Sequence, residues 1–187
     1  MITREQAWKL LTDNMQSQNL RRHCLSVEAV MCALAKRLGG DTEKWGIVGL
    51  LHDGDYEKTK ETPEKHAKLA AGWVKDLGET DEELLTGIES HGWFHIGKLP
   101  ETKMQSALYC CDELTGLIVA VALVKPDKKL ASVTVDSIKN KWREKSFAAG
   151  VDRNQIEKCD EMLGIPLDEF LETTLSAMQA IAPELGL

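Results

Sequence analysis

Hydrophobic residues recur along most of the chain at intervals of three and four, the spacing that places them on one face of an α-helix. The pattern is clearest in a stretch that begins near Asn19 and stops at the Gly39-Gly40 pair. Its apolar positions are Leu20, Cys24, Val27, Met31, Leu34 and Leu38. Alternating strand patterns are absent, and the β-branched cluster 133–135 is too short to specify a strand. We therefore predict an all-α protein.

Cap and turn residues divide the pattern into successive helices. The predicted spans are about 3–15, 19–38, 41–51, 63–77, 80–91, 104–125, 134–146, 152–163 and 167–182. Pro63 suits the first helical position of the fourth span, because its missing N–H costs nothing there. The segments 54–62 and 92–103 are expected to be loops. Since no repeat or flexible linker interrupts the chain, we predict one domain, a helical bundle over residues 1–187.

Composition narrows the class of protein. The chain has 187 residues, of which 43% are hydrophobic and 28% charged, as in a globular domain. Its net charge of −7 argues against binding to a nucleic-acid polymer or an anionic membrane, since basic patches drive both. No run of ~18 uncharged apolar residues and no signal-peptide pattern is present. Five cysteines without CxxC spacing suggest free thiols. We expect a cytoplasmic protein, and no pattern specifies its oligomeric state.

A few polar residues stand in apolar surroundings. His52 and Asp53 follow the apolar run 46–51, and His23 lies among the core-facing positions of its helix. Asp112 lies within a long apolar stretch, where its only charged neighbour is Glu113. Each residue alone has an ordinary structural explanation, yet a buried carboxylate is costly unless it is paired, protonated or bound to a metal. Imidazole and carboxylate together suit Fe, Mn, Zn, Co or Ni. The set predicts a metal site.

In this order and helical context, the four residues resemble the H…HD…D pattern of the HD-domain superfamily of metal-dependent phosphohydrolases, in particular its HDIG-like subgroup. The matching segments are His23, LLHDGDYE around His52 and Asp53, and CCDELTGLI around Asp112. The resemblance covers about residues 20–125 and leaves about 130–187 as a helical extension. It implies a helical bundle of the HD type, in which these four residues hold one catalytic divalent ion.

Two further histidines bear on a second ion. Some HD subfamilies add two histidines between the HD pair and the last Asp, and His66 and His91 fall in that interval. His91 is the stronger candidate, since it ends a predicted helix just before Gly92. His66 is expected within a helix whose neighbouring positions are polar. The predicted cofactor is one or two divalent transition-metal ions, with Mg also open.

The resemblance implies hydrolysis of a phosphomonoester or phosphodiester, with a nucleotide as the expected substrate. A divalent ion lowers the pKa of a bound water and neutralises phosphoryl oxygens. The predicted catalytic residues are Asp53 and Asp55, the latter as a residue that orients a ligand. Many HD proteins carry Lys or Glu where this chain has Tyr56, so the general acid or base stays open. The predicted substrate-binding residues are Arg22, Lys58 and His95.

Three other interpretations fit the same residues. Six-ligand HD sites with two irons also occur in oxygenases, which substrate-dependent O₂ uptake would reveal. A non-catalytic HD module would bind a metal or a nucleotide without turnover. A purely structural bundle would purify without metal.

Overall fold

The computed structural model describes all residues, 1–187, and every regular element in it is a helix, so the prediction of an all-α fold is confirmed. The α-helices are α1 (Arg4–Asn14), α2 (Gln18–Leu38), α3 (Thr42–Leu51), α4 (Tyr56–Thr59), α5 (Lys68–Asp76), α6 (Glu82–Glu89), α7 (Trp93–Ile96), α8 (Lys103–Leu123), α9 (Val135–Trp142), α10 (Arg153–Glu157), α11 (Cys159–Leu163), α12 (Leu167–Ala180) and α13 (Ala182–Leu185). Short 3₁₀-helices are η1 (Pro63–Lys65), η2 (Ser90–Gly92) and η3 (Leu130–Ser132).

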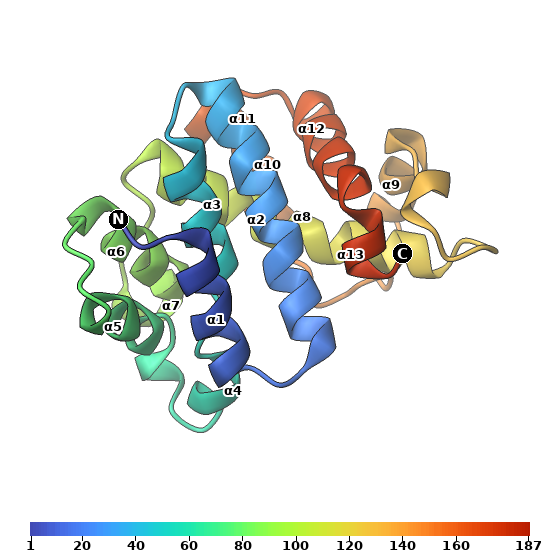
Figure 1. Cartoon of the computed structure of the whole chain (residues 1–187). Helices are drawn as coiled ribbons and strands as arrows, with labels where there is room; N and C mark the ends of the chain where they lie inside the picture. Colours follow the sequence, from blue (N-terminus) through green and yellow to red (C-terminus); the bar gives the residue numbers. More distant parts are fainter.

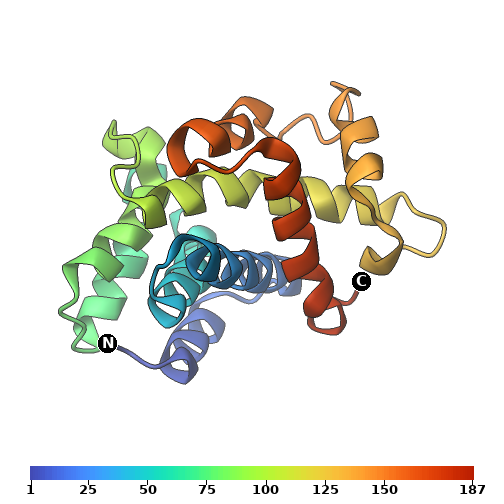
Figure 2. The same cartoon turned by 90° about the horizontal axis from the view of Figure 1, so that it is seen from above.

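Two long helices, α2 and α8, form the centre of the molecule. Each has 21 residues. They contact one another, α3 packs along α2, and α12 lies against both. Helices α5 to α7 gather at one end of the molecule and α9 lies at the other (Figures 1 and 2). The arrangement brings the end of α3 to the place where α2 and α8 meet.

Local sequence explains where the main helices begin and end. Thr102 starts α8 with a capping box, in which its side chain accepts from the backbone N–H of Gln105 and the Gln105 side chain accepts in return. The Asp41 side chain caps α3, and Gly39 ends α2 in the left-handed conformation that favours glycine. These capped ends agree with the boundaries predicted from the sequence.

Helix α8 contributes more buried residues to the core than any other helix. It is long and apolar enough to cross a membrane by length and composition alone. However, 61% of its most apolar window is buried within the fold, and the core helix of a globular bundle passes the same test. Asp112, midway along it, has only 14% of its side chain exposed and lies next to the imidazoles of His23 and His52.

The structure corrects several predicted boundaries. The span 63–77 is not one helix: η1 ends at Lys65, and α5 begins only at Lys68. His66 lies in the break, because Ala67 has a positive φ of 65° that no α-helix accommodates. The short helices α4 and α7 occupy the predicted loops, and 152–163 is divided into α10 and α11. Only the break at His66 changes the geometry of the functional site.

Candidate metal centre

Six side chains from separate parts of the sequence converge where α2, α3 and α8 meet. His23 comes from α2 and Asp112 from α8. His52 is the residue that ends α3, and Asp53 follows it. His66 comes from the break before α5, and His91 from η2 after α6. All six residues predicted as metal ligands are thus brought together, and we call them the His/Asp cluster.

One half of the cluster is built on the long helices. The Nε2 atoms of His23 and His52 lie 3.2 Å apart. Both approach Oδ1 of Asp112, at 3.0 Å from His23 and 3.5 Å from His52. Their ligand atoms lie within 4.8 Å of one another, a spacing that suits a single ion between them.

The other half is built on the short elements. The Nε2 atoms of His66 and His91 both lie 3.1 Å from Oδ1 of Asp53. The second oxygen of Asp53, Oδ2, faces the opposite way, 3.7 Å from the Nε2 atoms of His23 and His52. The Asp53 carboxylate therefore spans the two halves, with one oxygen directed to each.

Three of the four imidazoles contact an oxygen atom outside the cluster through Nδ1, which fixes the orientation of the ring. His52 Nδ1 lies 2.7 Å from the carbonyl oxygen of Gly49, and His66 Nδ1 lies 2.7 Å from Oδ1 of Asp55. His23 Nδ1 lies 3.4 Å from the Thr115 hydroxyl, which donates its own hydrogen to the Asp112 carbonyl. A ring that donates from Nδ1 carries its free lone pair on Nε2. All three rings can therefore present lone pairs to the centre of the cluster, as metal-binding histidines do.

The residues present fit a divalent metal. Oδ1 of Asp53 is fully buried and accepts no hydrogen bond, although two imidazole nitrogens lie close to it. Such an oxygen is costly to bury unless a cation or a donor satisfies it. His52 and Asp53 are buried, and 26% of the His23 side chain is exposed. The cluster is thus sheltered from solvent and open at its His23 edge.

The electrostatics of the cluster couple its acids to its bases. Burial raises the pKa of Asp53, but the imidazoles of His52, His66 and His91 outweigh it and hold that pKa well below its usual range. Burial likewise raises the pKa of Asp112, but the imidazoles of His23 and His52 lower it by more, so the pKa lies below its usual range. Conversely, burial lowers the pKa of His66, whereas Asp53 and Asp55 raise it to about 9. Without a metal, the carboxylates therefore hold protons on His66 and His91, whose pKa values they raise.

Asp55 organises the segment that carries His66. Its fully buried carboxylate accepts hydrogen bonds from the backbone N–H groups of Ala67 and Ala70, at 3.1 and 2.8 Å. These N–H groups belong to the first turn of α5, which has no other side-chain cap. The same carboxylate holds His66 Nδ1. Asp55 thus stabilises the break in the chain and orients the imidazole that follows from it.

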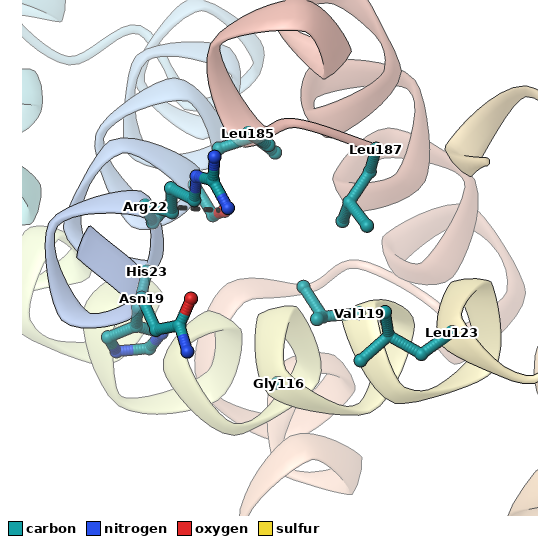
Figure 3. Close-up of a pocket in the computed structure, with 9 residues that line it drawn as sticks. Asn19, Arg22, His23, Gly116, Val119, Leu123, Leu185 and Leu187 are labelled. Atoms are coloured by element: carbon teal, nitrogen blue, oxygen red, sulfur yellow. Dashed lines mark hydrogen bonds between the residues drawn. The ribbon is translucent and has the colours of Figure 1, made fainter. Parts of the chain in front are cut away.

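Two hollows flank the cluster. The first, the His23 pocket, has a volume of about 290 Å³ and includes His23, Asn19, Arg22 and Ser26 (Figure 3). The second, the His66 hollow, has a volume of about 350 Å³ and includes His66 and Lys60. Both hollows reach a predicted ligand of the cluster, so each gives a route by which a substrate could approach it.

The predicted substrate-binding residues fall in different places. Arg22 lines the His23 pocket, and His95 lines the His66 hollow. The structure does not bring Lys58 to either hollow, because its ammonium lies over the Trp73 ring, 5.4 Å from the centroid. Lys60, two residues on, lines the His66 hollow instead.

Sequence reasoning missed Lys60, Asn19 and Thr115. Lys60 is four residues after Tyr56, so both lie on one face of a helical turn, and this spacing was the available signal. Asn19 likewise precedes His23 by four residues on α2. Thr115 follows Asp112 by three residues on α8. Helical spacing from Tyr56, His23 and Asp112 would have found all three.

Comparisons with known proteins agree with this geometry. The family model described as HD domain matches residues 20–124. Ribonuclease Y of Lawsonia intracellularis is 35% identical over 101 residues, which are 54% of this chain and 19% of that protein. Ribonuclease Y of Nitratidesulfovibrio vulgaris (strain DP4) is 31% identical over 100 residues, 54% of this chain and 18% of that protein. The chain thus spans about a fifth of the length of these relatives. No solved structure matches it.

Proposed function

On the premise that this chain belongs to the HD-domain family, we propose that it is a metal-dependent phosphohydrolase that cleaves a phosphate ester of a nucleotide. The family supplies the general chemistry, and the His/Asp cluster supplies the residues for it. The observation that carries the proposal is the Asp53 carboxylate. One of its oxygens lies 3.1 Å from the Nε2 atoms of both His66 and His91, while the other faces His23 and His52.

The donor set supports a site for two ions. His23, His52 and Asp112 form one compact group. The Nε2 atoms of His66 and His91, each 3.1 Å from Oδ1 of Asp53, form the other. Two carboxylates and four neutral imidazoles would carry a charge of −2, which leaves two divalent ions with a net positive charge. Bound ions of this kind lower the pKa of a water and neutralise phosphoryl oxygens. Fe, Mn, Zn, Co and Ni all suit these ligands.

The chain's own residues do the remaining work. Asp55, Gly49 and Thr115 hold three imidazoles in the orientation that directs Nε2 inward. This preorganisation spares the site a reorganisation when charge develops on the phosphoryl group. Arg22 on one side, with Lys60 and His95 on the other, would contact the anionic parts of a substrate that lies across the cluster.

The charge of the chain favours a small substrate. The relatives are named ribonuclease, and a ribonuclease cleaves phosphodiester bonds. This chain carries a net charge of −7, and counterion release from a polyanion requires basic surfaces. A mononucleotide or a short phosphodiester, held by a few local cations, suits such a protein better than long RNA does.

The test combines metal analysis with a substrate screen. The protein is purified without chelators, its metal content is measured, and hydrolysis is assayed with added Mn²⁺ or Fe²⁺. The substrates are nucleoside monophosphates, cyclic nucleotides, dinucleoside polyphosphates and short oligoribonucleotides. Metal-dependent phosphate or nucleotide release supports the proposal. Metal-loaded protein that hydrolyses none of them, or that consumes O₂ with substrate instead, contradicts it.

A further inference from the structure

The His23 pocket has a polar end and an apolar end. At the polar end, His23 joins the pocket to the His/Asp cluster, with Asn19 and Arg22 beside it on α2 (Figure 3). At the apolar end, the walls come from the second half of α8 and from the last residues of the chain. The apolar wall residues are Val119, Leu123, Leu185 and Leu187. A ligand in this pocket would therefore lie with one end at the cluster and the other between aliphatic side chains.

The two polar side chains on α2 are free to bind a ligand. The Arg22 guanidinium forms no ion pair or hydrogen bond with another side chain. Only the Arg22 carbonyl oxygen is engaged by a side chain: it accepts from the Ser26 hydroxyl at 2.9 Å. The Asn19 amide is exposed and engaged with no other residue. A free amide offers both a donor and an acceptor, which can pair with the edge of a heterocyclic base.

Part of the pocket wall comes from outside the region shared with the family. The HD match ends at residue 124, whereas Leu185 and Leu187 close the pocket opposite α8. Between them, Gly186 has a φ of 72°, and a Cβ there would lie 2.7 Å from an Arg22 nitrogen. The C-terminal segment therefore packs directly against the Arg22 side chain. Its position makes the pocket a feature of this chain rather than of the shared region.

From these features we infer that the His23 pocket binds the base of the nucleotide whose phosphate is cleaved at the cluster. This inference rests on the proposed function and assigns a place to the part of the substrate that does not react. A base has apolar faces that suit the aliphatic walls, and polar edges that suit the Asn19 amide. A sugar phosphate without a base would leave hydroxyl groups against leucine.

The pocket volume agrees with one compact group. At about 290 Å³ it lies at the small end of ligand pockets, which is too little for a long acyl chain. The guanidinium of Arg22, between the aliphatic walls and His23, is placed to contact the phosphate or to stack on the base. The residues of the C-terminal extension would then select which phosphate esters are cleaved.

A substitution at Gly116 tests the assignment. This glycine lines the pocket on α8, and a Cβ built on it meets no atom within 4 Å. Gly116→Leu should fill the pocket without a clash, in a helix that accepts leucine better than glycine. Gly72→Leu is the matched control, because Gly72 is an exposed glycine within α5 whose Cβ also meets nothing within 4 Å. Circular dichroism verifies that both variants keep their helices.

The probes are the four common ribonucleosides, which lack phosphate, titrated calorimetrically into the metal-loaded full chain. We expect at least one to bind the unaltered protein and Gly72→Leu equally. Gly116→Leu should weaken that binding by about tenfold or more, the scale on which a pocket rejects extra methylene groups. Leu187→Ala should weaken it as well. Equal binding to the unaltered protein and Gly116→Leu overturns the inference.

A parallel assay separates this inference from the proposed function. It measures hydrolysis of a generic ester, bis(p-nitrophenyl) phosphate, by the same metal-loaded preparation. Hydrolysis without binding of any nucleoside overturns the base pocket and leaves the phosphohydrolase proposal standing. Nucleoside binding that Gly116→Leu abolishes, without hydrolysis of any ester, supports the pocket and overturns the proposed function.

Discussion

The two halves of the His/Asp cluster are built in different ways. His23 and Asp112 project from helices of 21 residues, and His52 stands at the end of a third, buried helix. His66 and His91 come from a break in the chain and from a three-residue 3₁₀-helix. The first half is held by the packing of the core, since α2 packs closely against both α3 and α8. The second depends on a few hydrogen bonds, chiefly those of the Asp55 carboxylate with His66 and with the backbone N–H groups of Ala67 and Ala70.

This difference indicates two metal positions of unequal strength. A helix buried in a core holds its side chains to one geometry, because any shift disrupts close packing. The break at His66 includes a residue with positive φ, a conformation that costs free energy and persists only while its surroundings hold it. We therefore expect the ion near His23, His52 and Asp112 to bind tightly, and the ion near His66 and His91 to be lost more easily.

The largest effect is expected at Asp53, whose two carboxylate oxygens face the two halves at the centre of the cluster. Asp53→Ala should remove a ligand from both ions and leave the buried imidazoles without their carboxylate. We expect metal content to fall to near zero and activity to fall by more than ~100-fold, beyond the cost of losing an outer-shell contact. Elemental analysis and turnover measure this, with circular dichroism to verify helicity. A variant that keeps its full metal content would exclude Asp53 as a ligand.

The next largest effect is expected from a double substitution that removes one of the two metal positions and leaves the other. Replacing both His66 and His91 with Ala should remove the weaker position and leave the helical group of His23, His52 and Asp112. Metal should fall from about two ions per chain toward one, and added Mn²⁺ should no longer raise activity. His95→Ala is the control, since His95 lies in the His66 hollow without a contact to the cluster carboxylates. An unchanged metal content in the double variant would show that the second ion, if any, lies elsewhere.

A smaller effect is expected from Asp55→Asn, which keeps the side-chain shape but weakens the contact with His66 Nδ1. Affinity for the second ion should fall by about 10–100-fold, while the first ion is retained. Metal titration followed by calorimetry measures the two affinities. Asp81→Asn is the matched control, because Asp81 caps α6 away from the cluster. Equal loss of affinity in both variants would assign the effect to general destabilisation rather than to His66.

The smallest effect concerns pH in the metal-free protein. The folded pKa of His66 is raised from 6.5 to about 9, so the protonated form stabilises the fold fully below about pH 6.5. That contribution is lost as the pH rises through 9, and it amounts to on the order of 1–3 kcal/mol. Denaturant unfolding with chelator should therefore show decreasing stability over this range, with a smaller decrease in His66→Ala.

Metal-loaded protein should show the opposite trend, since metal binding requires neutral imidazoles and strengthens as protons leave. If the metal-free protein were equally stable across the whole range, the protonated imidazole would make no net contribution to the fold.

Much of the fold and of the cluster could be read from the sequence. The spacing of apolar residues and the stop at Gly39-Gly40 specified the main helices, because both signals act within one or two turns. His23 and Asp112 were recognisable as polar groups in apolar surroundings, where burial without a partner is costly. Such signals need only the identity of neighbouring residues, so the sequence alone carries them.

Other features were decided by the tertiary structure. His66 faces the cluster because Asp55 accepts from backbone N–H groups 12 and 15 residues away. These contacts stabilise a break where the sequence predicted a continuous helix after Pro63. Asp53 spans the two halves because three helices and two turns meet around it. The His23 pocket joins residues 19–26, 116–123 and 185–187, which no local pattern relates. Periodicity reports which face of each helix is buried, but only packing decides which faces meet, since contacts distant in sequence set their relative positions.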